Sequence, residues 1–263
     1  MSRHHATLLG ALLTALLMQL AVAATAMAGP YEDAQAAYGK GDFATALKLY
    51  RPLAQRGDAR AQDAIGGMYE RGEGGLPKDT AEALQWFKMA ENERLALKAY
   101  NDADYATASR IFRPLADRGQ ILAEYLVGLM YANGQGLPQD FAEAMKWHRK
   151  AAVQGEAKAQ FSVGVMYFKG LGTPTNHAEA FKWYRRAANQ GDPTAQYNLG
   201  AMYDKGEVVQ RDPVTALVFY DLAAVHAIKG AITAKARLKK SLSAAQVAEA
   251  DKRVLAWRPK REQ

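Results

Sequence analysis

A segment of about 36 residues recurs along this chain, and it constrains the fold more than any other feature of the sequence. Three regular copies begin at Tyr125, Phe161 and Tyr197. A glycine stands at the equivalent place in four copies, at Gly66, Gly128, Gly164 and Gly200. A period in this range is typical of solenoids, because one unit cannot bury its own apolar face and must stack on its neighbours.

Each copy contains two apolar stripes with helical spacing. In the unit that contains Gly164, the first stripe runs through Ala159, Gly164, Met166 and Tyr167. The second stripe runs through Ala180, Phe181, Trp183, Tyr184, Ala187 and Ala188. Spacings of three and four place these residues on one face of a helix, and the period of two that marks strands does not occur. We therefore predict an all-α fold, a right-handed α/α superhelical solenoid of stacked helical hairpins.

Capping residues mark the ends of the predicted helices. A side-chain oxygen that can cap the second helix recurs at Asp79, Asp140, Asn176 and Asp212. Three residues later, a carboxylate that would complete a capping box recurs at Glu82, Glu143 and Glu179, with Thr215 as the exception. Glycines suited to a left-handed C-cap end the first helices at Gly72, Gly134, Gly170 and Gly206. Others separate the hairpins at Gly57, Gly119, Gly155 and Gly191.

The recurring glycine inside each first helix needs its own explanation, because it costs about 1 kcal/mol relative to alanine there. We expect it to let a bulky side chain of the partner helix approach the backbone. The residues predicted to fill that space are Trp86, Trp147, Trp183 and Phe219.

The combined pattern resembles the Sel-1-like repeat family, a subclass of tetratricopeptide-like solenoids. Its elements are small alanines, Gly-x-Met-Tyr, Gly-x-Gly, a capping Asp and Ala-x-x-Trp-Tyr-x-x-Ala-Ala. The resemblance covers residues 58–91 and 120–227 closely. Two other segments look like shorter tetratricopeptide-like hairpins, because RPLADRG at Arg113 echoes RPLAQRG at Arg51. Within residues 29–228 we predict hairpins at about 31–56, 58–91, 93–118, 120–154, 156–190 and 192–227.

The N-terminus has the pattern of a signal peptide. Arg3 precedes an apolar run that extends from Ala6 to about Ala24, and Ala26 and Ala28 fit the small-residue positions of a cleavage site. We predict that residues 1–28 are removed and that the exported chain lies in the bacterial periplasm. The alternative is an uncleaved anchor, since the run approaches the ~20 residues that span a bilayer. The sequence predicts no membrane span in the mature chain, which contains no cysteine.

The C-terminal residues 229–263 carry the excess charge. They contain ten Lys or Arg against three Asp or Glu, which accounts for the whole formal net charge of +7. We predict that they form basic helices that cap the solenoid, the last of them beginning at Ser243. A solvated outer face would explain the charge, and contact with an anionic envelope surface is the alternative. Because the chain is predicted to be exported, we expect no nucleic-acid partner.

No residue pattern indicates catalysis. His148, His177 and His226 lack metal-ligand or catalytic spacing, and His148 stands in an aromatic packing position. Each Gly-x-Gly motif follows a predicted helix, whereas a nucleotide fingerprint follows a strand. We therefore expect no catalytic residue, cofactor or metal, and the chain is predicted not to be an enzyme.

The resemblance implies a ligand site on the concave side of the solenoid, which the first helices line. Three residues before the helix glycine, the positions that meet ligands are Asp63, Tyr125, Phe161 and Tyr197; five residues after it they are Arg71, Asn133, Lys169 and Lys205. Aromatic anchors would supply contact area to an extended peptide, and Lys or Arg would bind its carboxylates. Packing between hairpins is the alternative explanation for the tyrosines.

The function predicted from the sequence is a periplasmic scaffold or adaptor that binds a protein or peptide, in assembly or regulation of the cell envelope. One alternative is an envelope hydrolase, although the sequence offers no active site. Another is a binder of cell wall or anionic surfaces that works through the basic tail.

Overall fold

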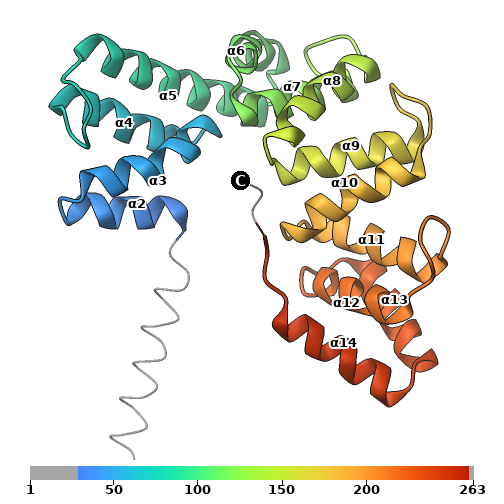
Figure 1. Ribbon diagram of the computed structural model, residues 1–263. Helices are drawn as coiled ribbons and strands as arrows, with labels where there is room; N and C mark the ends of the chain where they lie inside the picture. The colour runs from blue at the N-terminus through green and yellow to red at the C-terminus, as the bar shows by residue number, and fades with distance from the viewer. Residues whose placement is uncertain (1–28, 261–263) are drawn as a thin grey trace, which may run out of the picture. The chain divides into compact units, whose positions relative to one another are not determined.

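The computed structural model describes residues 29–260, and every regular element in that range is an α-helix (Figure 1). The predicted signal peptide lies outside the described residues. The chain divides into two compact units, residues 1–92 and 93–263, and the boundary falls within helix α5. Both units consist of stacked helical hairpins, which confirms the all-α solenoid class.

The first unit contains α2 (Pro30–Gly39), α3 (Phe43–Gln55), α4 (Ala59–Arg71) and the first part of α5 (Thr80–Asn101). Its core is built from alanines and a few larger side chains, including Tyr50, Ile65 and Met68. Small residues on the facing surfaces allow the helices to pack closely, so most of the buried alanines are fully inaccessible to solvent.

The second unit contains the rest of α5 and a series of nine further helices. These are α6 (Tyr105–Asp117), α7 (Ile121–Asn133), α8 (Phe141–Val153), α9 (Ala157–Lys169), α10 (His177–Asn189), α11 (Pro193–Lys205), α12 (Pro213–Ala224), α13 (Lys229–Ser241) and α14 (Ala244–Ala256). Each of α7, α9 and α11 forms a hairpin with the helix that follows it, and each hairpin packs on the next.

Helix α5 corrects one predicted boundary. The sequence predicts separate hairpins at about 58–91 and 93–118, whereas Thr80–Asn101 is one continuous helix of 22 residues. The other junctions between hairpins carry a glycine with positive φ, such as Gly57 or Gly119. The corresponding stretch around Asn92 contains neither glycine nor proline, so nothing in it interrupts the helix.

The predicted caps of the second helices are present. The side chains of Asp79, Asp140, Asn176 and Asp212 each accept a hydrogen bond from a backbone N–H in the first turn of the following helix. The reciprocal half of the capping box is not formed as predicted. Glu143 and Glu179 pair with the lysine three residues later, and Glu82 accepts a hydrogen bond from the Trp86 indole. These partners lie one turn along the helix, where a long carboxylate side chain also reaches.

The structure also corrects the partner of the recurring glycine. A Cβ added at Gly164 would lie 2.6 Å from Cδ1 of Tyr184, not against Trp183. The same relation holds in the other copies, whose glycines face Phe87, His148 and Tyr220. The aromatic residue one position after the predicted one is therefore the one that crosses the helix. The glycine brings the two helices close enough for this ring to contact the backbone.

Buried glutamines join one hairpin to the next. Gln160 in α9 donates from Nε2 to the carbonyl oxygen of Ala152 in α8, at 3.1 Å. Gln62 and Gln196 make the same bond to the residue eight positions earlier. Because unpaired buried amides are costly, each of these bonds fixes how one hairpin sits on its predecessor.

The C-terminal helices cover the last repeat, and α14 begins at Ser243 with a capping box completed by Gln246. Buried residues of α13 and α14, including Leu238 and Ala250, join the core of α12. The basic residues of α13 also neutralise carboxylates of the solenoid, since Lys235 pairs with Asp221 and Arg237 with Asp204. Beyond α14 the chain continues to Lys260, whose backbone N–H donates to the carbonyl oxygen of Asn189 at 2.8 Å.

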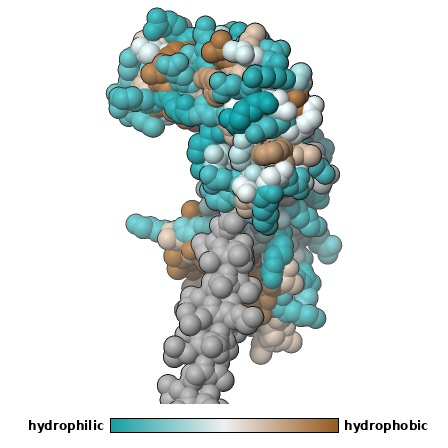
Figure 2. Space-filling model, turned by 90° about the vertical axis from the view of Figure 1, so that its left-hand side faces the viewer, coloured by the Kyte–Doolittle hydropathy of each residue, from teal (hydrophilic) through white to brown (hydrophobic). Residues whose placement is uncertain are grey.

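None of the helices between residues 29 and 260 combines the length and apolar character that a membrane span requires. The side of the molecule shown in Figure 2 is mostly hydrophilic, with hydrophobic residues in small separate patches. Scattered exposed apolar side chains are ordinary in proteins and do not by themselves indicate a binding site. A formed pocket is a stronger indication.

Candidate functional site

The eight candidate residues fall in both units, and the structure places them in different surroundings. Asp63 and Arg71 lie on α4 in the first unit. Arg71 is engaged within that unit, where its guanidinium bonds to Glu73 at 3.0 Å and to the Tyr38 hydroxyl at 2.8 Å. The other six candidates lie in the second unit.

Two of the aromatic candidates are occupied by packing. The Tyr125 ring lies 5.6 Å from the His148 ring, and burial raises the pKa of Tyr125 to about 12. The Tyr197 ring lies 5.9 Å from the Tyr220 ring and borders Gly230 of α13. Asn133 is exposed at the end of α7 and bonds to Gln135. The side chains at these positions therefore offer less free surface to a ligand than the sequence predicts.

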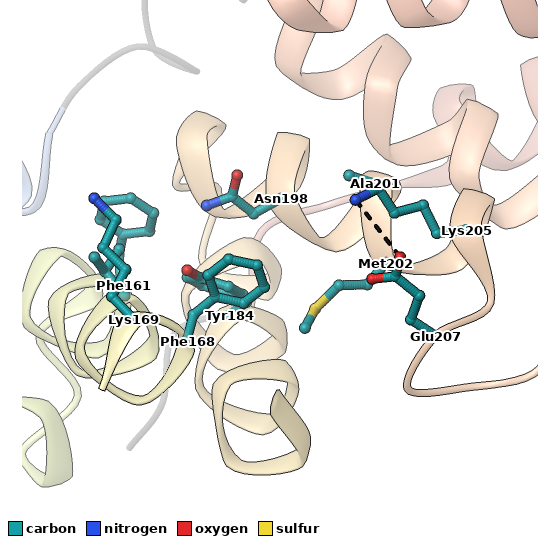
Figure 3. A pocket seen from close by; sticks show the side chains of 10 residues that line it. Phe161, Phe168, Lys169, Tyr184, Asn198, Ala201, Met202, Lys205 and Glu207 are labelled. Carbon is teal, nitrogen blue, oxygen red and sulfur yellow. Dashed lines mark ion pairs between the residues drawn. The ribbon is translucent and has the colours of Figure 1, made fainter. Parts of the chain in front are cut away.

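Three of the eight candidates line one pocket of about 430 Å³ between α9, α10 and α11. These are Phe161, Lys169 and Lys205. Figure 3 shows the side chains of this α9–α11 pocket, with Lys169 and Lys205 on opposite sides of the aromatic group. The volume lies within the roughly 300–1,000 Å³ typical of ligand sites, and the lining is mainly apolar.

The interior of the α9–α11 pocket is aromatic. The rings of Phe161 and Tyr184 lie 5.8 Å apart, and those of Phe168 and Tyr184 lie 6.5 Å apart. Burial raises the pKa of Tyr184 to about 12, while a hydrogen bond from Asn198 acts in the opposite direction. Tyr184 therefore stays a neutral phenol at physiological pH, and Met202 adds a flexible apolar surface.

The two lysines of the α9–α11 pocket differ in their partners. The Lys205 ammonium lies 3.7 Å from the Glu207 carboxylate. Lys169 is exposed, and none of the described residues gives it an ion pair. One side of the pocket therefore carries a free positive charge, whereas the charge on the other side is balanced.

Several residues of this pocket were not predicted from the sequence, above all Phe168. This side chain is 40% exposed and stacks on His177, with ring centroids 4.7 Å apart. At the same position the other copies have Glu70, Ala132 and Asp204. A large apolar residue at a position that is small or acidic elsewhere was the signal that could have revealed it. Tyr184 and Asn198 depend on the stacking of three helices, which the sequence does not display.

The described part of the chain offers surfaces for binding, and the surroundings of His148 do not favour catalysis. Burial lowers the pKa of His148 to about 4, and the 1% exposure of its side chain keeps substrates away from its ring. Within residues 29–260, no group of three His, Cys, Asp or Glu residues could hold a metal ion. The Gly-x-Gly segments follow α4, α7 and α9 as helix-ending turns, as predicted.

Comparison with known families decides the nature of the repeat. The Sel1 repeat model matches residues 21–58, 59–93, 121–156, 157–192 and 193–224. This chain belongs to the Sel1 repeat family. The family covers one segment more than the resemblance seen in the sequence, since the first hairpin also matches it. Sel1 repeat proteins are generally protein-interaction scaffolds and are typically non-catalytic.

One solved structure agrees with this membership. A Sel1 repeat protein from Oxalobacter formigenes has a similar structure, with a TM-score of 0.53 and 27% sequence identity, covering 86% of this chain and 99% of that one. The structure of c5321, a protective antigen of uropathogenic Escherichia coli with an SLR fold, has a TM-score of 0.48 and 22% identity. It covers 89% of this chain and 62% of that one.

A curated relative matches only in part. The ERAD-associated E3 ubiquitin-protein ligase component HRD3B of Arabidopsis thaliana is 33% identical over 92 residues. The match covers 33% of this chain and 15% of the plant protein. It therefore extends over a small part of that much longer relative.

Proposed function

We propose that this chain is a non-catalytic scaffold or adaptor that binds a protein or peptide through the α9–α11 pocket. The observation that carries the proposal is the exposed Phe168 beside the apolar lining of a formed pocket. Exposed aromatic side chains at the mouth of such pockets are common anchors of protein interfaces. Family membership supports the same class of function.

The location that we propose is the bacterial periplasm, in assembly or regulation of the cell envelope. Its support is the sequence of residues 1–28 alone. Sequencing the N-terminus of exported material should give Gly29 as the first residue. A chain that retains Met1 and stays with the membrane would contradict the proposed cleavage.

The experiment that tests the binding site compares two substitutions of exposed apolar residues. Phe168→Ala removes the proposed anchor, and Leu84→Ala removes an apolar side chain that is 62% exposed on α5, outside the pocket. The full chain and both variants would capture partners from an envelope extract, followed by mass spectrometry. We expect a set of partners that is lost with Phe168→Ala and retained with Leu84→Ala. A captured set that is the same for all three proteins would contradict this site.

The basic C-terminal tail supports a second candidate function less well. Lys235 and Arg237 are paired with Asp221 and Asp204, whose side chains are nearly inaccessible, so these charges have a structural role. Binding of the tail to an anionic surface would use the remaining lysines and arginines. Salt-sensitive sedimentation with anionic vesicles would favour that function over a scaffold.

A further inference from the structure

We propose that the α9–α11 pocket binds a linear peptide segment in which an acidic side chain stands next to an aromatic one. The aromatic side chain enters the apolar interior, and the carboxylate is bound by Lys169. This inference rests on the proposed scaffold function and specifies the chemistry of the partner.

The first observation is a local pairing pattern at the ends of the first helices. In α4, α7 and α11 the last residue of the helix pairs with the residue two positions later, across the left-handed glycine. Arg71 pairs with Glu73 in this way, and Asn133 bonds to Gln135 at 3.2 Å. At the end of α11, Lys205 pairs with Glu207.

The end of α9 breaks this pattern. Lys169 is followed two positions later by Leu171, which has no polar group and packs partly against the core of the unit. The chain thus keeps a cation at the end of α9 and lacks the residue that would neutralise it. A helix C-terminus favours a cation, which accounts for a lysine there. It does not account for the loss of the partner at this end alone among the four.

The second observation is Phe168, the neighbour of this free cation. Its equivalents in the other copies are small or acidic, so the repeat does not need an aromatic residue at this position. Phe168 is also 40% exposed although it stacks on His177, so folding leaves much of its apolar surface uncovered. An unpaired cation and an unrequired aromatic ring therefore occur together, in one copy of the repeat.

The charges around the pocket set the order of the bound groups. Lys169 lies beside Phe161 and Phe168, and Lys205 with its ion pair lies on the other side of the Tyr184 ring (Figure 3). A bound carboxylate is stabilised most on the Lys169 side of the pocket, because Glu207 would repel it on the other side. Phe161, Tyr184 and Met202 then contact the aromatic side chain between the two lysines.

The occupant that we infer is an internal peptide segment and not a chain end. Polar groups lie on both sides of the aromatic interior, so a segment that crosses the pocket contacts Lys169 at one side and Lys205 with Glu207 at the other. Asn198 lies between these two sides and can accept a hydrogen bond from a peptide N–H. The volume of about 430 Å³ suits one or two residues, so the acidic and aromatic residues should be adjacent.

The test uses fluorescent peptides with blocked ends, carrying Glu-Phe, Gln-Phe, Lys-Phe or Glu-Gly at the centre of a Gly/Ser sequence. Anisotropy titrations with the full chain should show the tightest binding for Glu-Phe, about tenfold tighter than for Gln-Phe at low salt. Lys-Phe and Glu-Gly should bind weakest. A fifth peptide that ends in a free carboxylate on Phe tests the chain-end alternative, and tighter binding of that peptide would overturn the inference of an internal segment.

Two substitutions test the role of Lys169 directly. Lys169→Gln should remove the preference for Glu-Phe over Gln-Phe, and Lys169→Glu should transfer the preference to Lys-Phe. Lys158→Gln removes the same charge from α9 outside the pocket and should leave the preference unchanged. Lys169 and Lys158 are both exposed, so all of these variants are expected to fold.

The outcomes separate this inference from the proposed function. Equal binding of Glu-Phe and Gln-Phe, no binding of any peptide at 1 mM peptide, or an unchanged preference in Lys169→Gln would each overturn the inference. The scaffold function would still stand if Phe168→Ala lost captured partners while Lys169→Gln retained them. If neither substitution changed the captured set, both proposals would fail.

Discussion

The hairpins α9–α10 and α11–α12 are alike in the middle of their first helices and different at the ends. In the middle, Gly164 faces Tyr184 and Gly200 faces Tyr220 in the same way. At the ends, Phe168 and an unpaired Lys169 in one hairpin stand where Asp204 and an ion-paired Lys205 stand in the other. The contact between glycine and aromatic ring, which the copies share, holds the stack together. The residues at the end of α9, which only this copy has, are available for binding.

The largest expected effect concerns the shared part. Gly164→Leu should lower the free energy of unfolding by about 3 kcal/mol, because the new side chain would overpack against the Tyr184 ring. Gly39→Leu is the matched control, since nothing lies within 4 Å of the Cβ position at Gly39. Denaturant unfolding of both variants tests the comparison. Equal stability of the two variants would mean that close contact at the helix glycine is not what holds the hairpin.

The next effect is a pH dependence that one copy has and its neighbours lack. Burial lowers the pKa of His148 to about 4, so the unfolded chain binds more protons between pH 6.5 and pH 4. The contribution of the neutral His148 imidazole to the free energy of unfolding is therefore present above pH 6.5. It is lost as the pH falls towards 4, by at most about 1.4 kcal/mol per pH unit.

The control for this pH dependence is His148→Phe, which introduces the residue found at Phe87 in an equivalent position. Denaturant unfolding at pH 7, 6 and 5 should give a flatter profile for this variant than for the parent chain. The carboxylates titrate in both proteins, so the difference between the two profiles reports His148. Parallel profiles would contradict a buried neutral imidazole.

A smaller effect tests a difference between copies that has no functional role in this account. The turn after α5 places Ala103 at a φ of +61°, where the related first hairpin has Gly41 at +77°. Alanine in the left-handed region costs about 1 kcal/mol relative to glycine. Ala103→Gly should therefore raise the free energy of unfolding by about that amount and leave peptide binding unchanged. A lower melting temperature for this variant would contradict the expected relief of backbone strain.

Much of the fold could be predicted from the sequence, because its signals are local. Apolar spacing, capping residues such as Asp140, and left-handed glycines such as Gly170 located the hairpins between residues 120 and 227. The continuity of helix α5 also has a local cause in the sequence. That cause is the absence of a glycine at the expected junction between hairpins. The aromatic partner of Gly164 was misplaced by one residue, because helix crossing depends on rotation about the helix axis as well as on spacing.

The candidate site could be predicted only in part. Phe161, Lys169 and Lys205 followed from the repeat register and lie in one pocket. Tyr184 and Met202 complete it from other helices, so their contribution depends on how three helices stack. Tyr125 and Tyr197 illustrate the converse, since residues in the same register as Phe161 are covered by packing in their own copies.

The central claim is that the end of α9 is specialised for binding and not for stability. It is tested most directly by giving this end the residues that α7 has at the same two positions, namely Phe168→Ala and Lys169→Asn, after Ala132 and Asn133. One sample of the full chain would be measured for thermal unfolding and for binding of the Glu-Phe peptide. The account predicts a melting temperature within a few degrees of the parent and loss of peptide binding. Retained peptide binding, or unfolding of the variant, would contradict it.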